Sequence, residues 1–314
     1  MCYKTGKNAR YKQWLCYLFP LFLCWILIYP PDFFVFLSLQ ALALQMVVGW
    51  GLVIVLFPFF GKTRYIPPHL LGVLGSVWFL QPYVQTQPQK PAKLADTFKV
   101  LHLNVHGRNT QHAQLVEQLL RQEADLLALI EVNHRWAKVL KKGLHKQYPY
   151  AFVYPVDNLF SGIAIFAKYP LKNVQYIFND EPPTVVGDVL LPQGKVHFIS
   201  THISAPILQG RIPRRYSQMD KIAQQIKQDQ EKPLVLLGDF NAVPWERLIR
   251  DFKQSTHMQD TRASWLPTFP TWALWMGIPI DYIFYSPPLY CQHLNTFQNT
   301  GADHVGLVGE FGLK

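Results

Sequence analysis

Several short apolar segments of this chain end in an acid, an amide or an imidazole. LVLLGD (234–239) is followed at once by Phe240 and Asn241, and LLALI (126–130) continues into Glu131. Runs of this length and composition are typical of buried strands. Strand alternation would place Asp239 and Asn241 on one side and Phe240 in the packing behind them. A buried charge must be paired or bind a metal ion, so the pattern favours a β-rich domain whose strand ends converge.

Other segments carry polar residues at their ends in the same way: Asn104, His202, Asp281, Asp303 and His304. Each residue alone has an ordinary structural explanation. Asn104 could cap a turn, His202 could be a satisfied core histidine, and Glu131 could face solvent. Asp239 with Asn241 could form a turn, and Asp303 with His304 a polar loop. Because these explanations are independent, one shared site accounts for the whole pattern better than all of them together.

The soluble part alternates between short strand-like runs and helical runs. We expect strands at 98–104, 126–130, 151–154, 162–167, 185–191, 195–201, 233–238, 280–285 and 305–311. Helices are expected after an Asn109 cap, around Trp136, and over 214–228. Many short strands with helices between them predict an α/β fold of two packed sheets flanked by helices.

The first 89 residues contain three stretches without a charged side chain: 13–31, 33–60 and 65–89. A bilayer core needs about 20 mostly apolar residues per helix, and in the third stretch the best span is 70–83. The first stretch has the basic leader of a signal peptide, but no small-residue cleavage site follows it. We expect a membrane anchor of about three helices over residues 1–84, a polar linker over 85–96, and a soluble domain over 97–314.

The placement of Lys and Arg predicts the orientation of this anchor. Four of them precede the first stretch, and Lys62 and Arg64 lie between the second and the third. Cytoplasmic loops are rich in Lys and Arg. Three spans would therefore make this a multi-pass membrane protein with its N-terminus in the cytoplasm and its soluble domain on the outer side of the membrane. Two spans would leave that domain in the cytoplasm.

The net charge of +10 is concentrated in the N-terminal region. The first 93 residues hold 8 Lys and Arg and one acid, whereas the remaining residues hold 22 basic and 19 acidic side chains. Most of the excess therefore follows membrane topology and is not the footprint of a nucleic-acid surface. Cys291 is the one cysteine of the soluble part, which excludes a disulfide within it.

Six pieces of the soluble part match a known family pattern in wording and order: LHLNV (101–105), LLALIEVN (126–133), FISTHISAP (198–206), LLGDFNAVPW (236–245), IPIDYIFYS (278–286) and GADHVGL (301–307). They resemble the endonuclease/exonuclease/phosphatase superfamily, which includes deoxyribonuclease I and neutral sphingomyelinases. With its apolar N-terminal stretches, the chain looks most like a bacterial membrane-anchored branch. The resemblance implies a four-layer, deoxyribonuclease I-like sandwich.

The resemblance also implies a divalent cation, Mg²⁺ or alternatively Mn²⁺, at the site. Glu131 is expected as the main metal ligand, with Asn104 beside it and Asp303 completing the set. Hard oxygen ligands in small number suit Mg²⁺.

The same resemblance implies roles for the other residues. Asp239 is expected to position or activate the attacking water, and Asn241 to bind phosphate. Asp281 and His304 are expected to form a carboxylate–imidazole pair, and His202 to protonate the leaving oxygen. Which histidine is the acid and which the base stays open at this stage.

These residues predict a membrane-anchored, metal-dependent phosphoester hydrolase of phosphodiesterase or nuclease type. The substrate, nucleic acid or phospholipid, stays open, and so does the choice between diester and monoester. A non-catalytic membrane scaffold that kept the fold is the alternative from another class. Arg211, Arg214 and Arg215 follow FISTHISAP, and Arg215 or one of these neighbours is expected as a weaker phosphate contact, with a solvated helix start as the alternative. No protein partner is inferred.

Overall fold

A computed structural model describes residues 7–84, 96–157, 161–178, 182–207, 210–229, 231–298 and 300–314. The chain forms two compact units, divided after Gln85. Of the predicted linker over 85–96, only Asp96 lies within the described residues.

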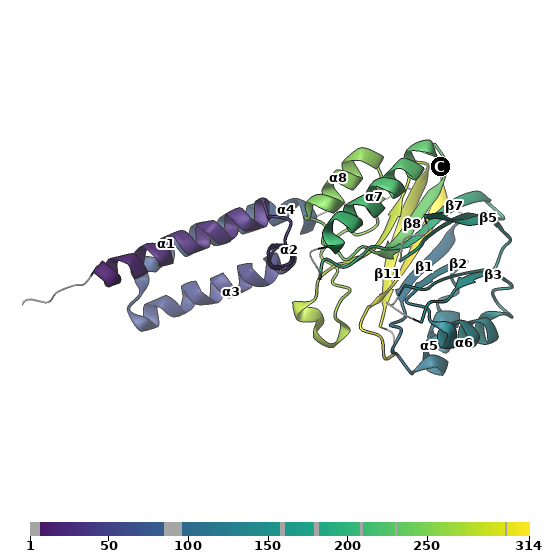
Figure 1. The fold of residues 1–314 in the computed structure, drawn as a ribbon, viewed down its shortest axis with the longest axis horizontal. Coiled ribbons are helices and arrows are strands. Elements are labelled where there is room, and N and C mark those ends of the chain that lie inside the picture. Colours follow the sequence, from purple (N-terminus) through teal and green to yellow (C-terminus); the bar gives the residue numbers. More distant parts are fainter. Residues whose placement is uncertain are drawn as a thin grey trace, which may run out of the picture. The chain divides into compact units, whose positions relative to one another are not determined.

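The first unit is helical (Figure 1). It comprises α1 (Lys7–Ile28), α2 (Phe34–Ala41), α3 (Ala43–Leu56), α4 (Ile66–Val84) and the 3₁₀ turns η1 (Phe57–Phe60) and η2 (Thr63–Tyr65). The first and third uncharged stretches each form one helix. The second is broken at Leu42, whose φ of −89° and ψ of 20° leave the helical range. Gly75 of α4 approaches α1 closely, since a Cβ there would lie 2.8 Å from the Cys24 sulfur.

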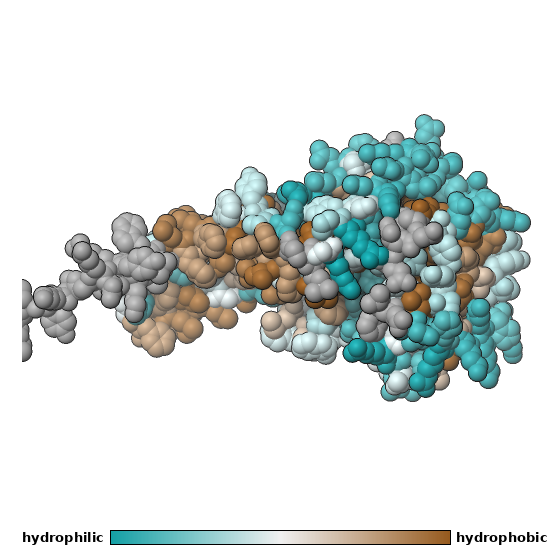
Figure 2. All heavy atoms as spheres, viewed as in Figure 1, coloured by the Kyte–Doolittle hydropathy of each residue, from teal (hydrophilic) through white to brown (hydrophobic). Residues whose placement is uncertain are grey.

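Apolar side chains cover much of the outside of this helical unit, as the brown atoms over α1 and α3 show (Figure 2). Phe19, Phe22, Leu52, Val55 and Trp78 are all exposed. Large exposed apolar patches mark contact with a membrane or another protein. Among the described residues, one stretch, Ala43–Phe60, is long and apolar enough to cross a membrane, and Tyr17–Ile28 is a shorter apolar helix. The three-span topology therefore stays a prediction.

The second unit contains two six-stranded sheets. The first has the order β11-β12-β1-β2-β4-β3 and the second β5-β6-β7-β8-β10-β9. The first sheet consists of β1 (Phe98–Asn104), β2 (Leu126–Ile130), β3 (Tyr150–Tyr154), β4 (Ile163–Ala167), β11 (Leu289–Phe297) and β12 (Gly306–Leu313). The second consists of β5 (Leu171–Phe178), β6 (Thr184–Leu191), β7 (Gly194–His202), β8 (Leu234–Asp239), β9 (Gln259–Asp260) and β10 (Asp281–Tyr285). Two neighbouring pairs are parallel, β1 with β2 and β7 with β8.

Four layers result, because helices cover the outer face of each sheet (Figure 1). Helices α5 (His112–Arg121) and α6 (His134–Leu144) pack on the first sheet, and α7 (Arg211–Gln228) and α8 (Arg247–Thr256) on the second. The apolar core between the sheets includes Val100, Ile165, Phe198, Leu237 and Phe311, all buried. This arrangement confirms the predicted α/β sandwich with flanking helices.

Helix α5 begins differently from the prediction. Its N-cap is Gln111, which makes no side-chain capping bond. Asn109 lies two residues earlier, where its side chain accepts from the Gln111 N–H and donates to the Thr300 carbonyl. Asn109 therefore ties two loops together and does not cap the helix.

Candidate active site

Strand register brings three predicted residues together on the second sheet. Asp281 at the start of β10 lies directly opposite Asp239 at the end of antiparallel β8. His202 at the end of β7 lies beside Asp239 in the parallel pair. Carboxyl ends of parallel strands share one sheet edge, and antiparallel β10 starts there. Residues far apart in sequence thus become neighbours.

Asp281 is held by two imidazoles. His304 Nδ1 lies 2.8 Å from Asp281 Oδ2, and His102 Nε2 lies 3.1 Å from Oδ1. An ionised carboxylate only accepts hydrogen bonds, so both rings donate to it and their tautomers follow. The backbone N–H of Asp281 also donates to the Thr268 hydroxyl at 3.2 Å. Asp281 is therefore fixed in place and in turn orients the His304 ring.

Asp239 lies between two imidazoles. Its Oδ2 is 3.7 Å from Nε2 of His304 and 3.7 Å from Nε2 of His202. Its Oδ1 accepts from the Asn241 N–H at 2.8 Å. Among the described residues, Oδ2 has no short hydrogen bond, and Asp239 and both histidines line the same pocket.

Burial and neighbouring charges shift the pKa values of Asp239, Asp281 and His304 in different directions. Burial and the Asp281 carboxylate raise the pKa of Asp239 to about 6, against the opposing effect of the two histidines. Burial would raise the pKa of Asp281 too, but His304 and His102 outweigh it and hold this pKa well below its usual range. Burial opposes protonation of His304, yet Asp281 and Asp239 raise its pKa to about 10. His304 is thus an imidazolium at neutral pH, facing the pocket.

Asn241 reaches the pocket through its backbone conformation. Phe240 is fully buried, and Asp239 and Asn241 both line the pocket, as predicted. However, β8 ends at Asp239, and Asn241 has a φ of 47° in the left-handed region. Strand alternation is therefore not what orients Asn241. Its amide donates to the Ile203 carbonyl at 3.0 Å and lies 3.3 Å from His202 Nε2.

Glu131 follows β2 and also has a left-handed backbone, with a φ of 60°. One of its carboxylate oxygens accepts from the Asn104 side chain and the other from the Gly107 N–H, both at 3.0 Å. Each oxygen keeps a further lone pair. Strained backbone of this kind costs of order 1–3 kcal/mol per residue and clusters at functional sites.

Asn104 lies next to Glu131, as predicted, and makes two hydrogen bonds there. Its amide oxygen accepts from the His106 N–H at 3.0 Å, and its NH₂ donates to Glu131. This oxygen keeps a further lone pair, so the expectation that Asn104 also contacts the cation stays a prediction. Its NH₂ group also orients the carboxylate of Glu131.

Arg215 does not reach the pocket, which corrects the predicted phosphate contact. Its side chain is fully buried, with one guanidinium nitrogen 2.7 Å from a Glu246 carboxylate oxygen and another 2.8 Å from the Asn241 carbonyl. A buried guanidinium needs such partners. Arg215 supports the Asn241 loop from behind.

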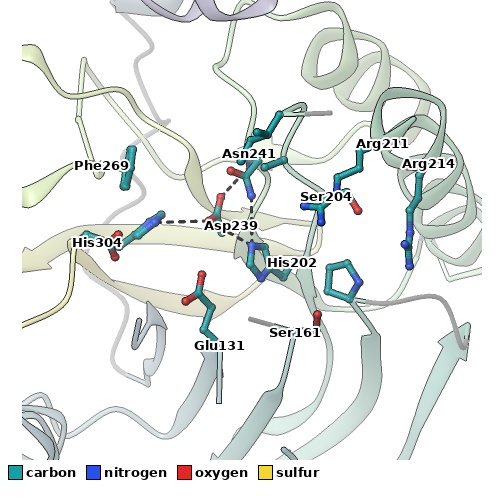
Figure 3. Close-up of a pocket in the computed structure, with 14 residues that line it drawn as sticks. Glu131, Ser161, His202, Ser204, Arg211, Arg214, Asp239, Asn241, Phe269 and His304 are labelled. Atoms are coloured by element: carbon teal, nitrogen blue, oxygen red, sulfur yellow. Dashed lines mark hydrogen bonds and ion pairs between the residues drawn. The ribbon is translucent and has the colours of Figure 1, made fainter. Parts of the chain in front are cut away.

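The pocket has a volume of about 240 Å³ and collects most of the predicted residues. Figure 3 shows Glu131, His202, Asp239, Asn241 and His304 around it, with Phe269 against His304. The Phe269 and His304 rings lie 4.8 Å apart between centroids. Asp303 lines the pocket too, and its carboxylate lies 3.1 Å from His106 Nδ1. Asp281 is buried behind His304 and is not among the lining residues.

Sequence reasoning missed two histidines, His102 and His106. Both belong to an alternating stretch in which Leu101, Leu103 and Val105 are buried against the α5–α6 layer. The polar residues between and after these apolar ones each contact a predicted site residue: His102 contacts Asp281, Asn104 contacts Glu131, and His106 contacts Asp303. This alternation was a readable signal, since one side of a strand faces one layer.

Two sets of groups could hold a cation. Among the described residues, Asp239, Asp281 and His304 each offer a ligand atom within 4.8 Å of one another, which is consistent with a divalent metal site. Both oxygens of Asp281 already accept a hydrogen bond from an imidazole, however, and His304 could bind a cation only through a deprotonated Nε2. Glu131 and Asp303 form the other set, which contains oxygen donors only and lines the pocket. Such donors fit Mg²⁺ better.

Residues 101–304 match the model of the Endonuclease/Exonuclease/phosphatase family, and the chain belongs to this family. Its fold and site are those of a phosphoester hydrolase. No match was found among curated proteins.

Solved structures of similar fold include the catalytic domain of human Nocturnin with bound sulfate, at a TM-score of 0.59 and 21% identity over 71% of this chain and 97% of that one. TDP2 from D. rerio, in complex with a single-strand DNA product, gives 0.56 and 18% over 69% and 99%. An AP endonuclease from Archaeoglobus fulgidus gives 0.56 and 17% over 68% and 98%. At these identities the likeness concerns the fold alone.

Proposed function

We propose that this protein is a membrane-anchored hydrolase that cleaves a phosphodiester by attack of a metal-assisted water on phosphorus. The observation that carries the proposal is the position of Asp239. Its Oδ2 lies between the imidazoles of His202 and His304 and shares their pocket with Glu131. An acid with a pKa near neutrality, next to a fixed cation, suits proton transfer and phosphate binding in one place.

In this proposal Glu131 and Asp303 hold Mg²⁺, with Mn²⁺ as the substitute. The ion, when bound, polarises the phosphoryl oxygens and offsets their charge. Asn104 and the Gly107 N–H keep the Glu131 carboxylate oriented, which is the usual task of groups behind a metal ligand.

The other residues act on water and phosphate. Asp239 accepts a proton from the attacking water. His304, kept protonated by Asp281, donates to a phosphate oxygen and stabilises the charge that develops on it. Asn241 offers its amide to the same phosphate. His202 is placed to give a proton to the leaving oxygen, because its ring faces the pocket on the other side of Asp239.

The anchor is part of the proposal. We place the N-terminal helices in a bacterial inner membrane as a multi-pass anchor of three spans, with the catalytic unit on the periplasmic side. The apolar exterior of α1, α3 and α4 and the Lys and Arg distribution support this. Fusions of a periplasm-dependent and a cytoplasm-dependent reporter to the C-terminus test it, and activity of the cytoplasmic reporter alone would contradict it.

A second candidate, a phospholipid phosphodiesterase, is favoured by one observation. Trp272 and Trp275 of η3 (Thr271–Met276) are 82% and 84% exposed, and the loop follows Phe269 of the pocket. Tryptophan is enriched at membrane–water interfaces. Two bare indoles beside the pocket would suit a site that works at a lipid surface.

The deciding experiment is turnover of a panel of phosphoesters by the intact chain. We expect Mg²⁺-dependent hydrolysis of bis(p-nitrophenyl) phosphate that Asp239→Ala abolishes. Plasmid DNA, RNA and phospholipid vesicles then rank the two candidate functions, and p-nitrophenyl phosphate tests for monoesters. If no substrate is turned over faster by the wild type than by Asp239→Ala, the non-catalytic scaffold becomes the better reading.

A further inference from the structure

Two arginines line the catalytic pocket without a task in the proposed chemistry. Arg211 and Arg214 stand in the first turn of α7 and belong to the pocket lining. In Figure 3 both extend from α7 on the side of the pocket away from Glu131 and His304. Both are half-buried. The pocket therefore has an acidic side and a basic side.

The position of these two arginines needs an explanation. Residues three apart on a helix are neighbours, and like charges at this spacing destabilise it. Neither guanidinium has a hydrogen bond or an ion pair to any residue in the described part of the chain. Arg215, next along the helix, is paired with Glu246 and buried. The same helix thus satisfies one arginine internally and leaves two facing the pocket.

The scissile phosphate does not require these arginines. Asn241, His202 and His304 surround the position proposed for it, and Glu131 with Asp303 would supply the cation. A guanidinium is the side chain best suited to bind a phosphate through two parallel hydrogen bonds. In a pocket of about 240 Å³, a group at the arginines must lie close to the group being cleaved.

We propose that Arg211 and Arg214 form a second anion-binding subsite, and that the substrate is a phosphoester carrying a second phosphate next to the scissile one. This inference rests on the proposed hydrolase function and narrows its substrate class. A neighbouring phosphate in a nucleotide strand and a phosphate on a phosphorylated headgroup share this chemistry.

The test compares matched substrates with and without the second phosphate. The dinucleotide dTpdT is assayed with neither end phosphorylated, with a 5′-phosphate and with a 3′-phosphate. Glycerophosphoinositol and its 4-phosphate form the headgroup pair. We expect the added phosphate to lower KM about tenfold or more in at least one pair, since bonds to charged groups are the strong ones. The pair that shows the gain identifies the source of the phosphate.

Two variants test whether the arginines cause the lower KM of the substrate with the added phosphate. In the double variant Arg211→Gln/Arg214→Gln the KM ratio between the matched substrates should fall to about one. Lys227→Gln removes an exposed positive charge from the last turn of the same helix and should leave the ratio unchanged. The subsite is refuted if no added phosphate lowers KM, or if the gain survives in the double variant.

A binding measurement separates this inference from the proposed function. If bis(p-nitrophenyl) phosphate and every other substrate stay intact, the hydrolase proposal fails by itself. Calorimetric titration of the same dinucleotide and headgroup pairs in EDTA, where no turnover occurs, then tests the subsite. Tighter binding of a ligand with the second phosphate to the wild type than to the double variant supports it, and equal binding in both pairs overturns it.

Discussion

His102 and Asp281 connect the two sheets of the sandwich through one hydrogen bond. His102 Nε2, on β1 of the first sheet, lies 3.1 Å from Asp281 Oδ1, on β10 of the second. Both side chains are fully buried. Because the other oxygen of Asp281 accepts from His304, the orientation of a pocket residue depends on a histidine of the opposite sheet.

Replacing His102 by leucine should lower kcat about 10- to 100-fold, the usual cost of losing a group that orients a site residue. Asp281 would lose the hydrogen bond from His102 in the buried interior. This loss should also lower the free energy of unfolding by about 1–3 kcal/mol. His102→Gln, which retains an N–H donor, should recover part of kcat. His293→Leu changes an exposed histidine of β11 and serves as the control. Equal kcat in His102→Leu and the wild type would contradict the positioning role.

Asp281→Asn should lower the pKa of His304 from about 10 towards its ordinary value of 6.5, because Asp281 is the strongest of the groups that raise it. The ring signals of His304, followed by NMR across the pH range, measure this directly. Asp303→Asn should lower the pKa much less, since Asp303 is the weakest of those groups. An unchanged His304 titration in Asp281→Asn would mean that the pair does not hold the proton.

Activity should depend on ionisation of Asp239. Its pKa is about 6, so kcat/KM of the wild type should fall about tenfold per pH unit below that value. His304 stays protonated up to about pH 10, so its deprotonation should contribute no decline between pH 7 and 9. A profile that is flat from pH 4.5 to 7 would remove Asp239 from the role of proton acceptor.

The same residue should reduce the stability of the fold at neutral pH. The pKa of Asp239 rises from 3.8 to about 6 on folding. The protonated carboxyl group therefore contributes to the stability of the fold fully below about pH 4, and this contribution is lost as pH rises through 6. Asp239→Asn should therefore unfold at a higher temperature than the wild type at pH 8. Its free energy of unfolding should exceed that of the wild type by a few kcal/mol at most. The gain should shrink towards pH 4. Thermal melts in EDTA measure this, and a lower Tm at pH 8 would contradict it.

Arg215→Met should destabilise the protein by about 3–5 kcal/mol, because it removes the guanidinium that is paired with the buried Glu246 carboxylate. The double change Arg215→Met/Glu246→Leu removes both charges and should cost clearly less. Urea unfolding of the three proteins gives the comparison. If the double variant is less stable than Arg215→Met, the ion pair is not what makes the single change costly.

Trp272→Ala/Trp275→Ala should weaken activity on phospholipid vesicles about tenfold or more if the second candidate function holds, because the indoles would seat the pocket at the lipid surface. Activity on a water-soluble diester should serve as the internal reference for each variant. Tyr290→Ala, a partly exposed aromatic change on β11, is the control. Equal loss on soluble and vesicle substrates would contradict a lipid role for this loop.

Strands with continuous apolar runs were predictable, whereas those with mixed faces were not. The apolar runs that end at Asp239 and Glu131 are buried on both sides, so their composition alone predicted them to be strands. Strand β11, with LYCQHLNTF, is exposed along much of its length and showed no such mark. Helix α8 was also missed, although one of its faces is buried. The missed elements lie at the edges or on the outside of the sandwich.

The sequence by itself determined which residue types stand at the strand ends, and from these the family and the acidic, amide and imidazole members of the site. Only the tertiary structure decided their partners. Strand register set Asp281 opposite Asp239, the packing of two sheets brought His102 to Asp281, and left-handed backbone at Glu131 and Asn241 turned both towards the pocket. Burial and neighbouring charge then set the protonation of Asp239 and His304, which no local sequence pattern contains. Arg215 was assigned to the pocket from its position along the chain, but helix packing turned it towards Glu246 and left Arg211 and Arg214 at the pocket instead.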